Sequence, residues 1–294
     1  MKKSAFSIIE ISIVIIVVAI IAVFAIDYSA ILKDTKLSNA KNLTQKSPIS
    51  QINNIAFWYE TSLDESFESD IKNNDIINSW YQSKLFSGNR IQLIQNDNND
   101  LLKPQYLEKG INELPSLLFN NSGNCLRNKG NNNVYFNGKN YSLYIIFKPY
   151  DTSSNHTLIH LEKTGIGSAI YLSLDLNNIN FSHRQIVSSS GGNNFTISNI
   201  SNNKIYIIKI VKRQNKLSMW LNNSKKIDQQ AIASSNFNVN DFNIHFGSHV
   251  CRNATLSRKF SGLISEIIIF NQALNSEDLQ LIDQYLSKKY LINL

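Results

Sequence analysis

The sequence lacks the short motifs that mark several classes of enzyme. It has no glycine-rich phosphate loop, no nucleophile elbow and no cysteine–histidine constellation, and the Gly-Ile-Gly at residues 165–167 is too short to indicate a nucleotide site. A cluster of basic residues is also missing. The 29 basic and 22 acidic residues give a formal net charge of +7, but they are scattered along the chain. Scattered charge is typical of a solvated surface, so no nucleic-acid partner is expected.

Cysteine is scarce, with two residues in 294, Cys125 and Cys251. A low and even count fits an exported protein with one disulfide. Such a bridge would close a loop of about 126 residues and contribute about 4–5 kcal/mol in the chain-entropy model. Two separate buried thiols remain the alternative, because the sequence does not place the two Cα atoms within bonding range.

A dense group of metal ligands is absent as well. His156 and His160 are four residues apart, and so are His245 and His249. On the strands predicted below, this spacing separates two side chains by about 13 Å, which is too far to share one ion. No metal and no cofactor are therefore predicted.

The chain does contain one long apolar run. Residues 6–26 read FSIIEISIVIIVVAIIAVFAI, which is 21 residues or about 31 Å of helix, enough to cross a bilayer. Lys2 and Lys3 precede the run and favour a cytoplasmic N-terminus. Glu10 interrupts it, and a carboxylate within a membrane costs roughly 2.5–3.5 kcal/mol. This charge therefore calls for a partner.

The segment resembles the N-terminus of type IV pilins and of type II secretion pseudopilins. In that family a prepilin peptidase cuts a basic leader after a small residue, the new N-terminal residue is methylated, and a glutamate at the fifth mature position meets a neighbouring subunit's amine. The resemblance implies cleavage after Ala5, where glycine is commoner, a mature N-terminus at Phe6, and Glu10 as the assembly acid. A plain signal anchor, or a signal peptide cut near Val23 and Ala25, fits the length but leaves Glu10 unexplained.

Beyond the apolar run the sequence predicts a continued helix to about residue 40, because Tyr28, Ile31 and Leu32 recur at helical spacing. Residues 41–54 are predicted to be a linker, since Pro48 disfavours helix at the residue before it. From residue 55 onward, short runs rich in β-branched and aromatic residues alternate with Asn/Gly/Ser turns. The clearest runs cover residues 142–148, 157–162, 169–176, 204–212, 216–221, 242–247 and 262–270.

Many short strands without interleaved helices predict a β-sandwich or jelly roll. The chain then ends in a predicted helix that Asn275 or Ser276 caps, with Glu277 in its first turn and Lys288 and Lys289 in its last.

Residues 55–294 also resemble the concanavalin A-like, laminin G-like jelly-roll family. The matching pieces include AFWYETSLDESF, INSWYQSKLFSGN, YSLYIIFKP and the closing FSGLISEIIIFNQALNSEDLQLIDQYLSKKY. Some enzymes of this fold cleave glycans with several carboxylates on one strand face, whereas Glu266 stands alone and is expected to be a fold residue. The tryptophans Trp58, Trp80 and Trp220 are expected in the core, although Trp220 alternates with Leu217, Met219 and Leu221 along its strand and an exposed position is its alternative.

Some members of that family bind calcium through loop carboxylates. Asp151 and Asp241 are the candidates here, but neither belongs to a dense acidic loop, so calcium is not predicted.

The sequence thus predicts a mainly β protein with an N-terminal transmembrane helix, a concanavalin A-like β-sandwich and a short C-terminal helix. The expected divisions are a leader at 1–5, a pilin-like helix at 6–40, a linker at 41–54 and a laminin G-like domain at 55–294. The predicted function is that of a minor pilin with a non-catalytic binding head for a glycan or an envelope protein. The alternatives are a type II secretion pseudopilin and a membrane-anchored periplasmic lectin-like protein that does not polymerise.

The predicted partners are the membrane, other pilin or pseudopilin subunits and the prepilin peptidase. The predicted location is the bacterial inner membrane, crossed once, with the C-terminal domain in the periplasm or on a surface filament.

Overall fold

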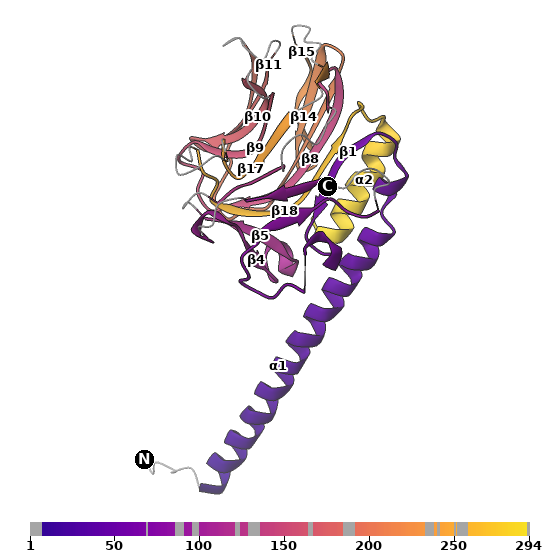
Figure 1. Ribbon diagram of the computed structural model, residues 1–294. Helices are drawn as coiled ribbons and strands as arrows, with labels where there is room; N and C mark the ends of the chain where they lie inside the picture. Colours follow the sequence, from indigo (N-terminus) through magenta and orange to yellow (C-terminus); the bar gives the residue numbers. More distant parts are fainter. Residues whose placement is uncertain are drawn as a thin grey trace, which may run out of the picture.

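The computed structural model describes residues 8–68, 70–85, 91–95, 100–120, 124–128, 136–163, 167–184, 192–232, 238–239, 242–249, 251 and 258–292. The side chains of residue 10 and of residues 23–33 lie outside this description. Two antiparallel sheets face each other as a sandwich, and the helix α1 (Ile8–Gln45) projects from it as a single rod (Figure 1).

The first sheet has eight strands. In spatial order they are β15 (Ser224–Ala231), β14 (Lys216–Leu221), β13 (Tyr206–Arg213), β8 (Asn140–Pro149), β18 (Gly262–Phe270), β5 (Ser116–Phe119) and β4 (Gln105–Leu107), and β1 (Ile55–Glu60) also pairs with β18. The long central strands β8 and β18 are buried along almost their whole length, which explains their continuous apolar sequences.

The second sheet also has eight strands. They are β12 (Gly192–Ser198), β11 (Asn178–Arg184), β10 (Gly167–Asp175), β9 (His156–Lys163), β17 (Phe242–Phe246), β6 (Leu126–Asn128), β3 (Gln92–Ile94) and β2 (Ser79–Tyr81). A two-stranded ladder joins β7 (Phe136–Asn137) to β16 (Asn238–Val239). Short 3-10 turns connect the strands: η1 (Pro48–Gln51), η2 (Asp64–Ser66), η3 (Asp100–Leu102) and η4 (Ile111–Glu113).

Two apolar cores hold the molecule together. The larger core fills the space between the sheets and contains Phe57, Trp80 and Ile267, each at most 1% exposed. The smaller core lies between the outer face of the first sheet and the C-terminal helix α2 (Ser276–Tyr290). Trp58 and Ile282 belong to it. The first sheet is therefore covered on both faces over its central strands.

The end of α1 packs into this smaller core. Ala40 of α1 and Ile49 of η1 are both buried there. The helix reaches Gln45, five residues past the predicted end at residue 40, and residues 48–51 form η1 against α2. Residues 48–51, within the predicted linker, are thus packed against the sandwich.

The predicted N-terminal transmembrane helix is wrong. In the described part of the chain, no helix combines the length and the apolar composition that a bilayer crossing requires. The same finding contradicts the predicted location, a single pass through the bacterial inner membrane.

The predicted strands and C-terminal helix are confirmed. The seven predicted runs correspond to β8, β9, β10, β13, β14, β17 and β18, with ends that differ by at most two residues. Asn275 is the N-cap of α2, where its side chain accepts a hydrogen bond from the backbone N–H of Asp278.

Candidate functional site

Two buried carboxylates lie side by side where α2 crosses the first sheet. Glu60 of β1 and Glu266 of β18 are direct partners in the ladder, and neither side chain is exposed. The Nζ atom of Lys289, from α2, lies 2.8 Å from Glu266 Oε2 and 3.3 Å from Glu60 Oε2. One ammonium thus serves two carboxylates in a site shielded from water.

Donors surround both glutamates. Glu60 accepts the backbone N–H groups of Ser62 and Leu63 at 2.7 and 3.0 Å, and the hydroxyl of Ser66 at 2.6 Å. Burial by itself raises the pKa of Glu60, but the Lys289 ammonium and the serine hydrogen bonds outweigh it and hold the pKa below its usual value. Glu60 is therefore ionised at neutral pH.

Glu266 is bound in a similar way. It accepts hydrogen bonds from the indole N–H of Trp58 at 2.8 Å and from the hydroxyls of Tyr285 and Tyr290 at 2.9 Å each. A general acid or nucleophile must reach its substrate, and this pair is enclosed by protein donors. The carboxylate pair is built to hold β1, β18 and α2 together, which agrees with the expectation that Glu266 is a fold residue.

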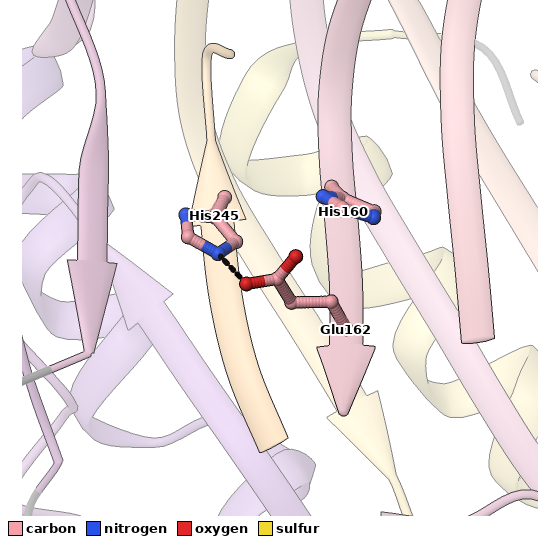
Figure 2. Close-up of side chains that lie close together, drawn as sticks. All are labelled: His160, Glu162 and His245. Carbon is pink, nitrogen blue, oxygen red and sulfur yellow. Dashed lines mark hydrogen bonds and ion pairs between the residues drawn. The ribbon is translucent and has the colours of Figure 1, made fainter. Parts of the chain in front are cut away.

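A second polar cluster lies on the outer face of the other sheet. His160 of β9 and His245 of β17 are direct ladder partners, and Glu162 follows two residues after His160, on the same face of β9 (Figure 2). Each side chain contributes one possible ligand atom, and these atoms all lie within 4.8 Å of one another. His245 Nε2 is 3.3 Å from Glu162 Oε1.

Two further rings enclose this cluster. His249, in the turn after β17, stacks on His160 with 4.2 Å between ring centroids, and Tyr171 of β10 meets His160 edge-on at 5.8 Å. Burial lowers the pKa of His160 to about 3, and the neighbouring His249 and His245 add to the effect. His160 is therefore neutral at physiological pH.

Hydrogen-bond partners define which ring nitrogen carries the hydrogen. Nδ1 of His160 donates to the backbone carbonyl of His249, which leaves Nε2 with the lone pair. Nδ1 of His245 accepts the N–H of Cys251 at 3.3 Å, so its Nε2 carries the hydrogen that points to Glu162. His160 thus has the form that binds metal ions, whereas His245 would have to exchange tautomers.

A disulfide anchors Cys251, whose backbone N–H bonds to the His245 ring. Cys125 and Cys251 are bonded, with 5.9 Å between their Cα atoms, and the Gln95 amide lies 3.1 Å from the Cys125 sulfur. The bridge fixes residue 251 beside the start of β6, close to the His245 ring.

A groove of about 630 Å³ opens on the outer face of the first sheet, beside the start of α2. Its lining includes Trp220 and Ser218 from β14 and the cationic side chains Arg213, Lys216 and Lys225. Three cations and one acid, Asp228, give the lining a net charge of 3 − 1 = +2. This surface can bind an anionic or hydroxyl-rich ligand.

Trp220 stands between two lysines within this region. The Nζ atoms of Lys209 and Lys225 lie 4.9 and 5.2 Å from the indole centroid. Trp58 and Trp80 are buried as expected, but Trp220 is only partly buried, because Leu217 and the other alternate residues of β14 take the inner face. The expectation of a core position is wrong for Trp220.

Several predicted site residues lie outside the described part of the chain. Ala5 and Phe6 precede residue 8, and the side chain of Glu10 is not described, so cleavage after Ala5 and pairing through Glu10 remain predictions. Asp241 also lies outside the description. The other calcium candidate, Asp151, has a pKa lowered to about 2 by hydrogen bonds from the backbone and hydroxyl of Ser153.

Sequence reasoning missed the histidine cluster because it considered spacing along one strand. His160 comes near His245 only through the pairing of β9 with β17, which are about 80 residues apart in sequence. The available signal was that both residues fall within predicted strands. The cross-strand register was not readable from the sequence.

Comparison with known proteins identifies the fold. No protein-family model and no curated protein sequence matches the chain. The binding domain of botulinum neurotoxin serotype D is similar in structure, with a TM-score of 0.55 and 15% identity over 81% of this chain and 53% of that one. The receptor-binding domain of the C/D mosaic serotype gives 0.55 and 14% over 79% of this chain and 51% of that one.

A further similar structure is the serotype D ligand-binding domain in complex with N-acetylneuraminic acid, with a TM-score of 0.53 and 14% identity over 81% of this chain and 52% of that chain. The chain spans about half the length of these structures. Identities this low show the fold alone, a jelly-roll-like β-sandwich, and lend no support to the pilin-like N-terminal segment.

Proposed function

We propose that this protein is a non-catalytic recognition subunit of a pilus-like filament. Its β-sandwich binds a glycan, and α1 packs among the equivalent helices of other pilin-type subunits. The observation that carries the proposal is the separation of two surfaces in one molecule. An exposed apolar helix lies at one end, and β14 and β15, which border a cationic groove, lie at the other (Figure 1).

The exposed side chains of α1 support the assembly role. Ile8, Ile15 and Ile21 are 83%, 62% and 61% exposed, and the large apolar side chains between them are all at least 48% exposed. A helix that is apolar on every side must be surrounded on every side to leave water. A bundle of like helices does this.

The resemblance to pilins indicates which charged groups would interact at the start of that bundle. A prepilin peptidase would cut after Ala5 and expose the amine of Phe6. The carboxylate of Glu10 would then pair with the amine of a neighbouring subunit, which removes the cost of burying either charge alone.

The groove supports the recognition role. Arg213, Lys216 and Lys225 can form charge-assisted hydrogen bonds with a sugar carboxylate, and Trp220 adds apolar contact area. A protein of this fold has been crystallised with N-acetylneuraminic acid, an acidic sugar. An acidic glycan therefore fits the charge of the groove and is of the same class as the ligand in that structure.

Incorporation into filaments tests the assembly role. In cells that produce the protein, Glu10→Ala is expected to leave the total amount of protein unchanged and to remove it from the sheared filament fraction. Glu277→Ala, which removes an exposed acid in the first turn of α2, is the matched control and should be incorporated normally. Incorporation of Glu10→Ala at the wild-type level would contradict the pairing.

Binding to immobilised glycans tests the recognition role. The full chain should bind carboxylated glycans more strongly than neutral ones. Arg213→Ala should weaken binding about 10-fold or more, because a hydrogen bond to a charged group contributes about 1.5–3 kcal/mol. Lys226→Ala, an exposed cation of β15 outside the groove lining, is the control. Equal losses in both variants would indicate unspecific charge attraction and count against the groove.

A further inference from the structure

The cluster of His160, Glu162 and His245 has the geometry of a metal-binding site. Direct ladder partners and residues two apart on one strand place their side chains on one face at close range. In a tetrahedral zinc site with bonds of about 2.0–2.1 Å, ligand atoms are about 3.3 Å apart. The 3.3 Å between His245 Nε2 and Glu162 Oε1 already has this value.

The ring of His160 is oriented as metal-bound imidazoles usually are. Its Nδ1–H donates to the backbone carbonyl of His249, and this type of outer hydrogen bond fixes the tautomer with a lone pair on Nε2. The stacked ring of His249 and the edge of Tyr171 restrict rotation of the His160 ring. The ligand is therefore held in place before any ion arrives.

The ligand types define the class of ion. Two imidazoles and one carboxylate suit zinc and its neighbours among the first-row transition metals, whereas calcium and magnesium require mainly oxygen ligands. We propose that His160, Glu162 and His245 bind one zinc-class divalent ion, with water in the fourth position. The ion would join β9 to β17 beside the disulfide that fixes Cys251.

One hydrogen bond must be exchanged when the ion binds. The ion replaces the hydrogen on Nε2 of His245, so the ring hydrogen moves to Nδ1, where the N–H of Cys251 now points. That bond is long, at 3.3 Å. The backbone at Cys251 turns its N–H away from the ring when the site is filled.

Zinc binding by the full chain tests the proposal independently of glycan binding and filament assembly. The purified protein is stripped with a chelator, dialysed against zinc and analysed for metal content, and its affinity is measured by competition with a zinc indicator. About one tightly held ion per chain is expected. Glu162→Gln and His245→Gln should weaken binding by at least about 10- to 100-fold, the range seen when even an outer partner of a metal ligand is lost.

His156→Gln is the matched control, because this histidine lies on the same strand and bonds to Asp151 at 3.0 Å instead of joining the cluster. It should keep the wild-type zinc affinity. Absence of tight zinc in the wild type, or equal binding by the wild type, Glu162→Gln and His245→Gln, would overturn the proposal.

A measurement on the wild type alone tests the proposal even if the variants do not fold. Amide hydrogen exchange at Cys251 should become faster when zinc is added, because its N–H loses the His245 acceptor. Unchanged exchange at saturating zinc would contradict the proposed ligand set.

Discussion

Lys289 is the residue on which the junction of α2 with the sheet depends most. It is 4% exposed and lies between the carboxylates of Glu60 and Glu266. Two adjacent buried carboxylates repel each other, and the ammonium converts this repulsion into attraction. The arrangement leaves a net charge of −1 on the three groups, which the surrounding hydroxyl and N–H donors stabilise.

Lys289→Met is therefore expected to lower the free energy of unfolding by about 3–5 kcal/mol, the range for removing one member of a buried ion pair. Denaturant unfolding measures it. Lys288→Met, at an exposed neighbouring position of α2, should change stability by no more than about 0.5 kcal/mol. A similarly small effect of Lys289→Met would mean that the carboxylates do not depend on the ammonium.

His183 gives the sandwich a dependence on pH. It is fully buried, and its Nδ1 shares a hydrogen bond with the hydroxyl of Tyr141 at 3.1 Å. Burial, with help from the Lys212 ammonium, lowers the pKa of His183 to about 3. Between pH 6.5 and 3 the unfolded chain binds a proton that the native protein does not, so acid favours unfolding.

The free energy of unfolding should accordingly fall by up to about 1.4 kcal/mol per pH unit below pH 6.5 on account of this residue. Chemical denaturation at pH 6, 5 and 4 measures the slope. His183→Gln keeps a hydrogen-bonding group for Tyr141 but does not titrate, so its slope should be shallower by that amount. Parallel slopes would show that His183 is not the responsible group.

At the scale of elements, prediction from sequence succeeded where the local pattern agrees with burial. β18 and β14 were located to the residue, because apolar, β-branched runs bounded by turn residues leave few alternatives. β11, β12 and β15 were missed. Their exposed faces are rich in Asn, Ser, Lys and Gln, and their extended form depends on the neighbouring strands. His160 and His245 are likewise brought together by the pairing of β9 with β17, and this pairing cannot be predicted from the sequence of either strand.

The start of α2 shows how a local signal can fix an element. Asn275→Ala should destabilise the protein by about 1 kcal/mol, because the backbone N–H of Asp278 loses its acceptor at 2.9 Å. Asn275→Asp keeps an acceptor oxygen and adds a charge that the helix N-terminus favours, so it should retain the wild-type stability. Thermal unfolding of both variants separates loss of the cap from a general effect of changing residue 275.

At the scale of the whole molecule, the direction of α1 relative to the sandwich is set by a small contact. The hydroxyl of Thr44, one residue before the end of α1, lies 3.2 Å from both Ser62 Oγ and the Tyr285 hydroxyl. Through Tyr285 this contact reaches Glu266 and Lys289. The charged network, α2 and the end of α1 therefore form one packed unit, and the recognition groove opens beside the start of α2.

Ile49 is the apolar part of that attachment, with no exposed surface. Ile49→Ala should leave a cavity between η1 and α2 and cost about 2–5 kcal/mol locally. Since the larger core is separate, we expect local release of residues 46–54 while the sandwich stays folded. Limited proteolysis should then cut this segment faster than in the wild type, with the sandwich surviving as a stable fragment. Ser50→Ala, at an exposed position of η1, should leave the cleavage rate unchanged. Cleavage of Ile49→Ala at the wild-type rate, or loss of the sandwich together with the segment, would show that the attachment of α1 is not a separable unit.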